Sequence, residues 1–167
     1  MNLKKLELSL EQENELILEY ESYVEDLLEN EDVNKMKEFK HHHYTTCFDH
    51  SLNVSFYSFV IAKRLGLDYV STARGGLLHD LFLYDWRSDE PREGKHAFAH
   101  PHIALRNAEK SFELNKIEKD IIVKHMWPVT IKLPKYKESF IVSCVDKYCA
   151  TMEFSNGLAK KLRYQLM

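Results

Sequence analysis

Histidine stands out in this chain both by its number and by its order along the sequence. There are nine histidines beside only five glycines and four prolines. The residues that could do chemistry lie within or at the end of different predicted helices, in the order His50, the pair His79-Asp80, His100, His125 and Asp146. Histidine nitrogens and carboxylate oxygens bind Zn, Fe, Mn, Co and Ni, and helical bundles build metal sites from single ligands on several helices. The pattern therefore predicts a transition-metal site, because calcium prefers oxygen ligands.

The same residues carry little information one at a time. A single histidine in a helix is more often a hydrogen-bonded core or surface residue than a ligand, and an HD dipeptide occurs by chance in many proteins. Neighbouring helical residues point about 100° apart, so His79 and Asp80 can flank one site mainly where the aspartate bridges two ions. The prediction therefore depends on the ordered set and not on any one member.

Helical periodicity dominates the segments that must position these residues. Apolar residues recur at three- and four-residue spacing and no stretch alternates as a strand does, so we expect an all-α, single-domain helical bundle. The pair Gly75-Gly76 inside a helix costs about 1 kcal/mol per glycine relative to alanine, which predicts close helix packing beneath a site. Pro101 is expected at the first position of its helix. The predicted helices cover residues 9–40 with a break near 30–32, then 48–65, 69–81, 101–112, 116–126, 137–154 and a short 158–166.

Composition excludes several classes of protein. The 167 residues suit one globular domain, with 29% charged and 44% hydrophobic residues. A formal net charge of -3, from 23 basic and 26 acidic residues, argues against a nucleic-acid polymer as partner. No apolar run approaches the roughly 20 residues of a membrane span, and the N-terminus lacks the apolar region of a secretory signal. Three cysteines without CxxC spacing indicate the reducing cytoplasm.

The ordered set resembles the HD-domain superfamily of metal-dependent phosphohydrolases in its extended H…HD…H…H…D form. The opening motif is represented by residues 48–54, the central one by Leu77-Leu78-His79-Asp80 after Gly75-Gly76, and the closing aspartate by residues 142–147. The organisation that the resemblance implies is an N-terminal helical extension over 1–44, an HD-type core over 45–155 and a short C-terminal helix packing on the core over 156–167.

The resemblance also implies which residues hold metal. One or two divalent ions of Mn, Fe, Co, Ni or Zn would bind, with His79 and Asp80 at the catalytic centre and Asp80 bridging the ions. Two ions about 3.5–4 Å apart can share a hydroxide and clamp phosphate oxygens. His102 competes with His100, and we favour His100 because Pro101 fixes it at a helix entrance. The implied ligands are His50, His79, Asp80 and Asp146 for the first ion, and His100 and His125 for the second.

One departure from the family concerns the substrate. Many members follow the HD pair with a glycine and a lysine that meets substrate phosphate, whereas this chain has Leu83 at the lysine position. Trp86 opens an irregular stretch, residues 85–99, that can supply a pocket wall. The alternative for its basic residues is a solvated loop. His41-His42-His43 is interpreted as a polar loop with one member near the mouth of the pocket, and adventitious metal binding is its alternative; the metal hypothesis gives the triplet no role. The candidates for substrate binding are Tyr84, Arg87, Arg92, Lys95, His96, His102 and Lys147.

Three functions follow from this resemblance. The first is a phosphohydrolase that cleaves a phosphomonoester or phosphodiester bond, in a nucleotide or another small phosphate ester, by metal-activated hydroxide. The second is a di-iron oxygenase on the same ligands, since some HD-fold proteins are oxygenases and these ligands suit iron. The third is a catalytically weak regulator that binds a nucleotide, which fits the missing lysine. The oligomeric state does not follow from the sequence.

Overall fold

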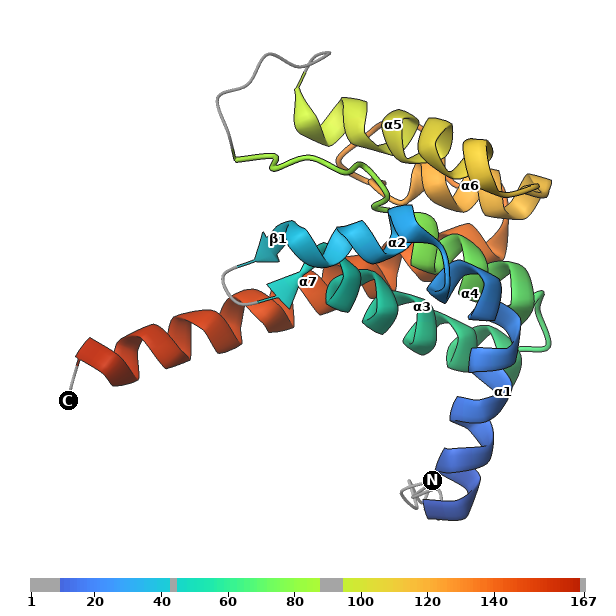
Figure 1. Cartoon of the computed structure of the whole chain (residues 1–167), viewed down its shortest axis with the longest axis horizontal. Helices are drawn as coiled ribbons and strands as arrows, with labels where there is room; N and C mark the ends of the chain where they lie inside the picture. The colour runs from blue at the N-terminus through green and yellow to red at the C-terminus, as the bar shows by residue number, and fades with distance from the viewer. Residues whose placement is uncertain (1–9, 43–44, 88–94, 166–167) are drawn as a thin grey trace.

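A computed structural model describes residues 10–42, 45–87 and 95–165 of the chain, which fold into a bundle of helices (Figure 1). The predicted all-α fold is confirmed. Beside the helices lies one two-stranded antiparallel sheet, β1 (Lys40–His42) and β2 (Thr45–Thr46). The helices of the described segments are α1 (Leu10–Leu28), α2 (Glu31–Lys35), the 3₁₀ turn η1 (Met36–Glu38), α3 (Cys47–Arg64), α4 (Tyr69–Leu78), α5 (His96–Ser111), α6 (Lys116–Lys124) and α7 (Lys137–Gln165).

Helices α3 and α4 pack against each other at the centre of the bundle, and the remaining helices surround them. Capping residues determine where these helices begin and end. Thr46 begins α3 through a capping box with Asp49, and Gly66 follows its end with a φ of 66°, which glycine adopts without strain. Asp68 then caps α4 by accepting a hydrogen bond from the Ser71 amide. The turn between the two helices is therefore locally encoded.

The Gly75-Gly76 pair lets neighbouring helices approach α4, as the sequence predicted. A Cβ on Gly76 would lie 2.9 Å from the Cα of Ser55 on α3. A Cβ on Gly75 would lie 2.8 Å from Cδ1 of Ile121 on α6. Both helices would have to move away from α4 to admit a side chain at these positions.

The N-terminal helices share the core of the bundle. Val24, Leu27 and Val33 are fully buried and pack with residues of α3 and α4. The hydroxyl of Tyr20 donates to Ser55 Oγ at 2.8 Å, and Ser55 in turn donates to the carbonyl of Ala73 at 2.6 Å. Residues before the predicted HD core therefore belong to the same folded unit.

Three expectations about element boundaries were wrong. Residues 40–42 and 45–46 form the small sheet and not a loop, because strands of two or three residues are too short to show alternation. Helix α5 begins at His96, so Pro101 lies inside it. This position follows the first turn of the helix, where proline is best tolerated. Helix α7 runs through Asn156-Gly157 to Gln165 without a break, since one glycine costs a long helix only about 1 kcal/mol. The distal part of α7 extends away from the bundle (Figure 1).

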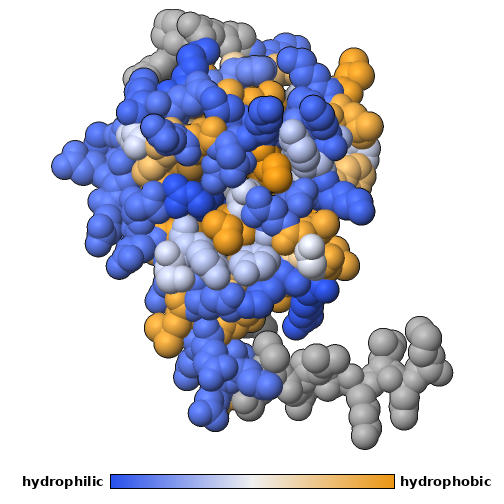
Figure 2. Space-filling model, turned by 90° about the vertical axis from the view of Figure 1, so that its right-hand side faces the viewer, coloured by the Kyte–Doolittle hydropathy of each residue, from blue (hydrophilic) through white to orange (hydrophobic). Residues whose placement is uncertain are grey.

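The surface is polar over much of its area. On the face shown in Figure 2, hydrophobic residues are scattered among hydrophilic ones. Within the described segments, none of the helices combines the length and the apolar character that crossing a membrane requires.

We expect Gly76→Ala to lower the free energy of unfolding by about 1–3 kcal/mol, because the added methyl group meets the Ser55 backbone. An exposed helical glycine would instead gain about 1 kcal/mol from this change. Urea denaturation measures the difference. Asn53→Ala, at an exposed position of α3, is the control and should change stability by less than about 0.5 kcal/mol. A Gly76→Ala protein as stable as the wild type would contradict the close contact.

Candidate metal centre

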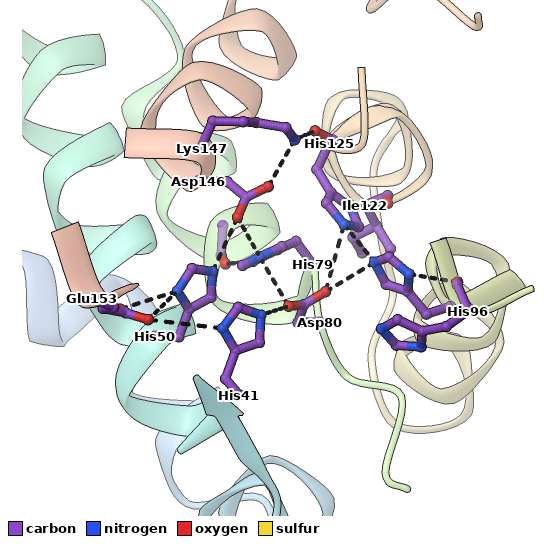
Figure 3. A network of polar contacts seen from close by, with 12 residues as sticks. His41, His50, His79, Asp80, His96, Ile122, His125, Asp146, Lys147 and Glu153 are labelled. Carbon is purple, nitrogen blue, oxygen red and sulfur yellow. Dashed lines mark hydrogen bonds and ion pairs between the residues drawn. The ribbon is translucent and has the colours of Figure 1, made fainter. Parts of the chain in front are cut away.

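The His79-Asp80 pair lies directly after the last residue of α4. The helix ends at Leu78, and His79 is its C-cap residue. The chain then turns, with the Phe82 amide donating to the Asp80 carbonyl at 2.8 Å and Leu83 at a φ of 52°. Because the helix ends here, the two side chains are not held to the angle between neighbouring helical residues. Both point into the same buried space (Figure 3).

Three buried histidines are oriented by backbone carbonyls of their own helices. Nδ1 of His79 lies 2.7 Å from the Gly76 carbonyl, and Nδ1 of His125 lies 2.8 Å from the Ile122 carbonyl. Nδ1 of His100 lies 2.8 Å from the carbonyl of His96. A carbonyl oxygen can only accept, so each Nδ1 must carry the proton that it donates. In the neutral rings, each Nε2 is then an unprotonated lone pair.

The Nε2 atoms of these histidines lie close together, in an arrangement that a bound cation would stabilise. His100 Nε2 lies 2.8 Å from His125 Nε2 and 3.2 Å from Oδ1 of Asp80. His79 Nε2 makes no hydrogen bond within the described part of the chain, although it is buried. A proton on one ring would relieve one of these contacts, whereas a metal ion relieves several together. Ligand atoms that are each roughly 2.0–2.2 Å from one ion lie about 3–3.4 Å apart, so the donor set fits a transition metal.

The Asp80 carboxylate faces two groups of histidines, one with each oxygen. Oδ1 lies 3.2 Å from His100 Nε2 and 3.5 Å from His125 Nε2. Oδ2 lies 3.5 Å from His79 Nε2 and 3.2 Å from His41 Nε2. This is the arrangement that a carboxylate bridging two ions needs, and it corresponds to the bridging role that the family resemblance implies for Asp80.

His50 and Asp146 complete the side of the site next to His79. His50 Nε2 lies 3.0 Å from Oδ1 of Asp146, and the same oxygen lies 3.9 Å from His79 Nε2. On its other edge, His50 Nδ1 lies 3.1 Å from Oε1 of Glu153. Burial alone would lower the pKa of His50, but the Asp146 and Glu153 carboxylates raise it to about 10. A metal ion would replace the proton between His50 and Asp146.

At His79, His125 and the two aspartates, the electrostatic environment favours the protonation states that bind metal, whereas His50 must lose a proton to do so. Burial lowers the pKa of His79 and brings the pKa of His125 well below its usual value, so both rings are neutral. Burial alone would raise the pKa of the Asp80 carboxyl, but His79, His100 and His41 hold it well below its usual value. The pKa of Asp146 is lowered in the same way, mainly by His50. Neutral imidazoles and ionised carboxylates are the forms that act as ligands.

A cavity of about 250 Å³ opens onto this cluster. Trp86 and His96 form an aromatic wall, with their rings stacked at 5.4 Å, and His96 also stacks on His100 at 4.5 Å. Asp80 and Lys147 supply charged groups. The cavity is smaller than the roughly 300–1,000 Å³ of sites that enclose a drug-sized ligand, so it fits a phosphate group with part of its ester.

The structure brings all six predicted ligands together, from five segments of the chain. His50, His79, Asp80, His125 and Asp146 face one another (Figure 3), and His100 joins them because its Nε2 lies 2.8 Å from Nε2 of His125. His100, and not His102, is the member of the cluster, since His100 is buried and His102 is exposed. The reason differs from the predicted one: Pro101 lies inside α5, and the His96 carbonyl positions the His100 ring.

The predicted substrate-binding residues divide into two sets. His96 and Lys147 line the cavity, and the Tyr84 hydroxyl lies 2.9 Å from His96 Nδ1 behind it. Lys147 Nζ contacts Oδ2 of Asp146 at 2.8 Å and the His125 carbonyl, so it supports ligand residues. Arg87, Lys95 and His102 do not line the cavity, since Arg87 pairs with Asp85 at the surface and Lys95 and His102 are exposed. Arg92 lies outside the described residues.

Two residues of the site were missed by the sequence analysis, His41 and Glu153. His41 lies on β1 within the histidine triplet, where neither helical spacing nor a known motif distinguishes one member from another. Glu153 follows Asp146 by seven residues on α7, which places both on the same face of the helix. That spacing was visible in the sequence, and a search for carboxylates two turns from Asp146 would have found it.

Comparison with known proteins agrees with this geometry. Residues 47–151 match the model of the HD domain, which is well over half of the chain. The chain belongs to the HD domain family. This family is part of the superfamily of metal-dependent phosphohydrolases, so the HD-domain assignment made from the motif order is confirmed.

A curated relative shows how far the similarity extends. Ribonuclease Y of Pseudothermotoga lettingae is 35% identical over 85 residues, which are 51% of this chain. The chain spans only 16% of the length of that relative. No solved structure matches this HD-domain chain significantly.

We expect Mn²⁺, Co²⁺ or Zn²⁺ to raise the melting temperature of the metal-free protein. An ion present at a concentration of 100 times its Kd stabilises the folded state by about 2.7 kcal/mol. For a domain of this size, that raises the melting temperature by roughly 5–10 °C. Thermal melts after treatment with EDTA measure the shift, and Ca²⁺ should give a much smaller one. The shift should vanish in Asp80→Ala and persist in the control His102→Ala. Equal shifts in the two variants would mean that the ions bind elsewhere.

Proposed function

We propose that this HD-domain protein is a metal-dependent phosphohydrolase that cleaves a phosphomonoester or phosphodiester bond, with a nucleotide as substrate. The observation that carries the proposal is the Asp80 carboxylate, whose two oxygens face separate groups of imidazole Nε2 atoms. A carboxylate in this position is suited to hold two ions side by side. Ions bound there would polarise phosphoryl oxygens and lower the pKa of water.

The residues of this chain have distinct tasks in such a reaction. Asp80 joins the two halves of the site, and His79 is held by the Gly76 carbonyl so that its Nε2 faces the ions. Lys147 fixes the Asp146 carboxylate and the end of α6 at once. The stacked rings of Trp86, His96 and His100 exclude water from one side of the cavity. None of these groups needs to form a covalent bond to the substrate.

The lining of the cavity supports a nucleotide as the substrate class. Trp86 and His96 offer aromatic surface, and Ala97, Met126 and Ala150 are apolar. Aromatic and apolar surface beside a phosphate site suits a nucleoside and not a bare sugar phosphate. Leu83, at the position of the family lysine, is half-buried against the core, so phosphate recognition would depend on the ions and not on a lysine there.

A panel assay tests this proposal. Nucleoside mono-, di- and triphosphates, cyclic nucleotides, sugar phosphates and a short oligoribonucleotide are each incubated with Mn²⁺, Fe²⁺, Co²⁺, Ni²⁺ or Zn²⁺. The oligoribonucleotide is included because the curated relative is named a ribonuclease. We expect metal-dependent hydrolysis of a nucleotide, with phosphate or a new phosphomonoester as product.

Variants then assign the activity to the site. Asp80→Ala should lower kcat/KM by at least about 10²–10³-fold, because it removes the group that joins the two halves of the site. His102→Ala, an exposed histidine on the same helix as His100, should leave kcat/KM unchanged. Full activity of Asp80→Ala would overturn the proposal. Oxygen consumption without hydrolysis would identify an oxygenase, and tight nucleotide binding without turnover under every metal would identify a regulator.

A further inference from the structure

His41 and Glu153 occupy the metal centre although both lie outside residues 47–151, which match the family model. His41 comes from β1, six residues before the matched region, and Glu153 from α7, two residues after it. The side chain of His41 is only 14% exposed, and that of Glu153 only 11%. Segments on either side of the matched region therefore add a histidine and a glutamate to the centre. The other residues of the centre lie within residues 47–151.

His41 lies beside His50 with the same orientation. The two rings are stacked, with centroids 3.9 Å apart and planes 17° from parallel. In both rings Nδ1 faces the Glu153 carboxylate, at 3.1 Å from His50 and 3.8 Å from His41. In both rings Nε2 faces an aspartate of the centre, Asp146 for His50 and Asp80 for His41 (Figure 3). His41 thus repeats the geometry of a family ligand.

The ligand atoms of His41 also meet the distance requirement for a shared ion. His41, His50 and Asp80 each offer one atom, and these atoms lie within 4.8 Å of one another. His41 Nε2 is 3.2 Å from Asp80 Oδ2, the carboxylate oxygen that faces the His79 side of the site. An ion held by the His50 side therefore lies within reach of a further imidazole.

We propose that His41 is an additional ligand of the ion on the His50 side, and that Glu153 is the positioning residue that orients both imidazoles. This inference rests on the metal site of the proposed function. A carboxylate behind a metal-binding histidine fixes the ring and its tautomer and makes Nε2 a stronger donor. One glutamate beside two stacked histidines would couple β1 to the middle of α7 through the metal.

The test measures metal affinity directly, with Mn²⁺ and Co²⁺ titrated into the full-length, metal-free protein by calorimetry. His41→Ala and His41→Gln should each weaken binding of one ion at least tenfold. Glutamine can still donate a hydrogen bond to Asp80, but it lacks the imidazole nitrogen. Loss of an imidazole ligand should also change the visible absorption of the Co²⁺ form. Glu153→Gln should weaken the same ion by about 10–100-fold.

Matched controls separate this inference from the proposed function. His102→Gln and Glu113→Gln change exposed residues of the same types and should bind both metals as the wild type does. Circular dichroism of each metal-free variant checks its fold. If His41→Gln has wild-type affinity and a wild-type Co²⁺ spectrum while Asp80→Ala does not bind, the His41 assignment is wrong and the metal site stands. If the wild type itself binds neither ion, the proposed function fails as well.

Discussion

The hydrogen bond from a histidine Nδ1 to a backbone carbonyl of its own helix is the interaction on which this centre depends. It occurs at His79, His100 and His125, each time with a carbonyl three or four residues earlier. The bond has two effects at once, since it fixes the direction of the ring and leaves the Nε2 lone pair facing the centre. The backbone of the bundle therefore determines the protonation pattern of the site, and side-chain partners are needed only for His50 and His41.

Helix ends make this arrangement possible. His79 and His125 are C-cap residues of α4 and α6, and the carbonyls near a helix C-terminus lack a partner within the helix. A histidine at such a place satisfies a carbonyl and turns its other nitrogen away from the helix. His100 differs, because it lies inside α5, beside Pro101. The missing amide of Pro101 gives α5 a locally weaker hydrogen-bond pattern at the same turn.

The sequence predicts the all-α fold, and the six side chains that it proposes as ligands lie close together in the structure, because helical periodicity and the order of the histidines and aspartates can both be recognised along the chain. Caps at Asp68 and Asn115 mark helix starts through local chemistry, and the glycine pair marks close packing that no other residue permits. The position of the basic residues relative to the cavity is not predictable in the same way. Arg87 and Lys95 are basic residues near the site in sequence, but a side chain's direction depends on the path of the loop, which the sequence pattern does not fix.

The order of the candidate ligands along the chain has a consequence for how the centre is assembled during synthesis. The residues of the His50 side begin at His41 and end at Glu153, so this half of the centre is split between the first and the last parts of the fold. The other half, with Asp80, His100 and His125, is finished earlier. A nascent chain without α7 thus has histidines but lacks Asp146, and it can offer the first ion only an incomplete set of ligands. Tight retention of that ion would then mark a chain in which α7 has docked.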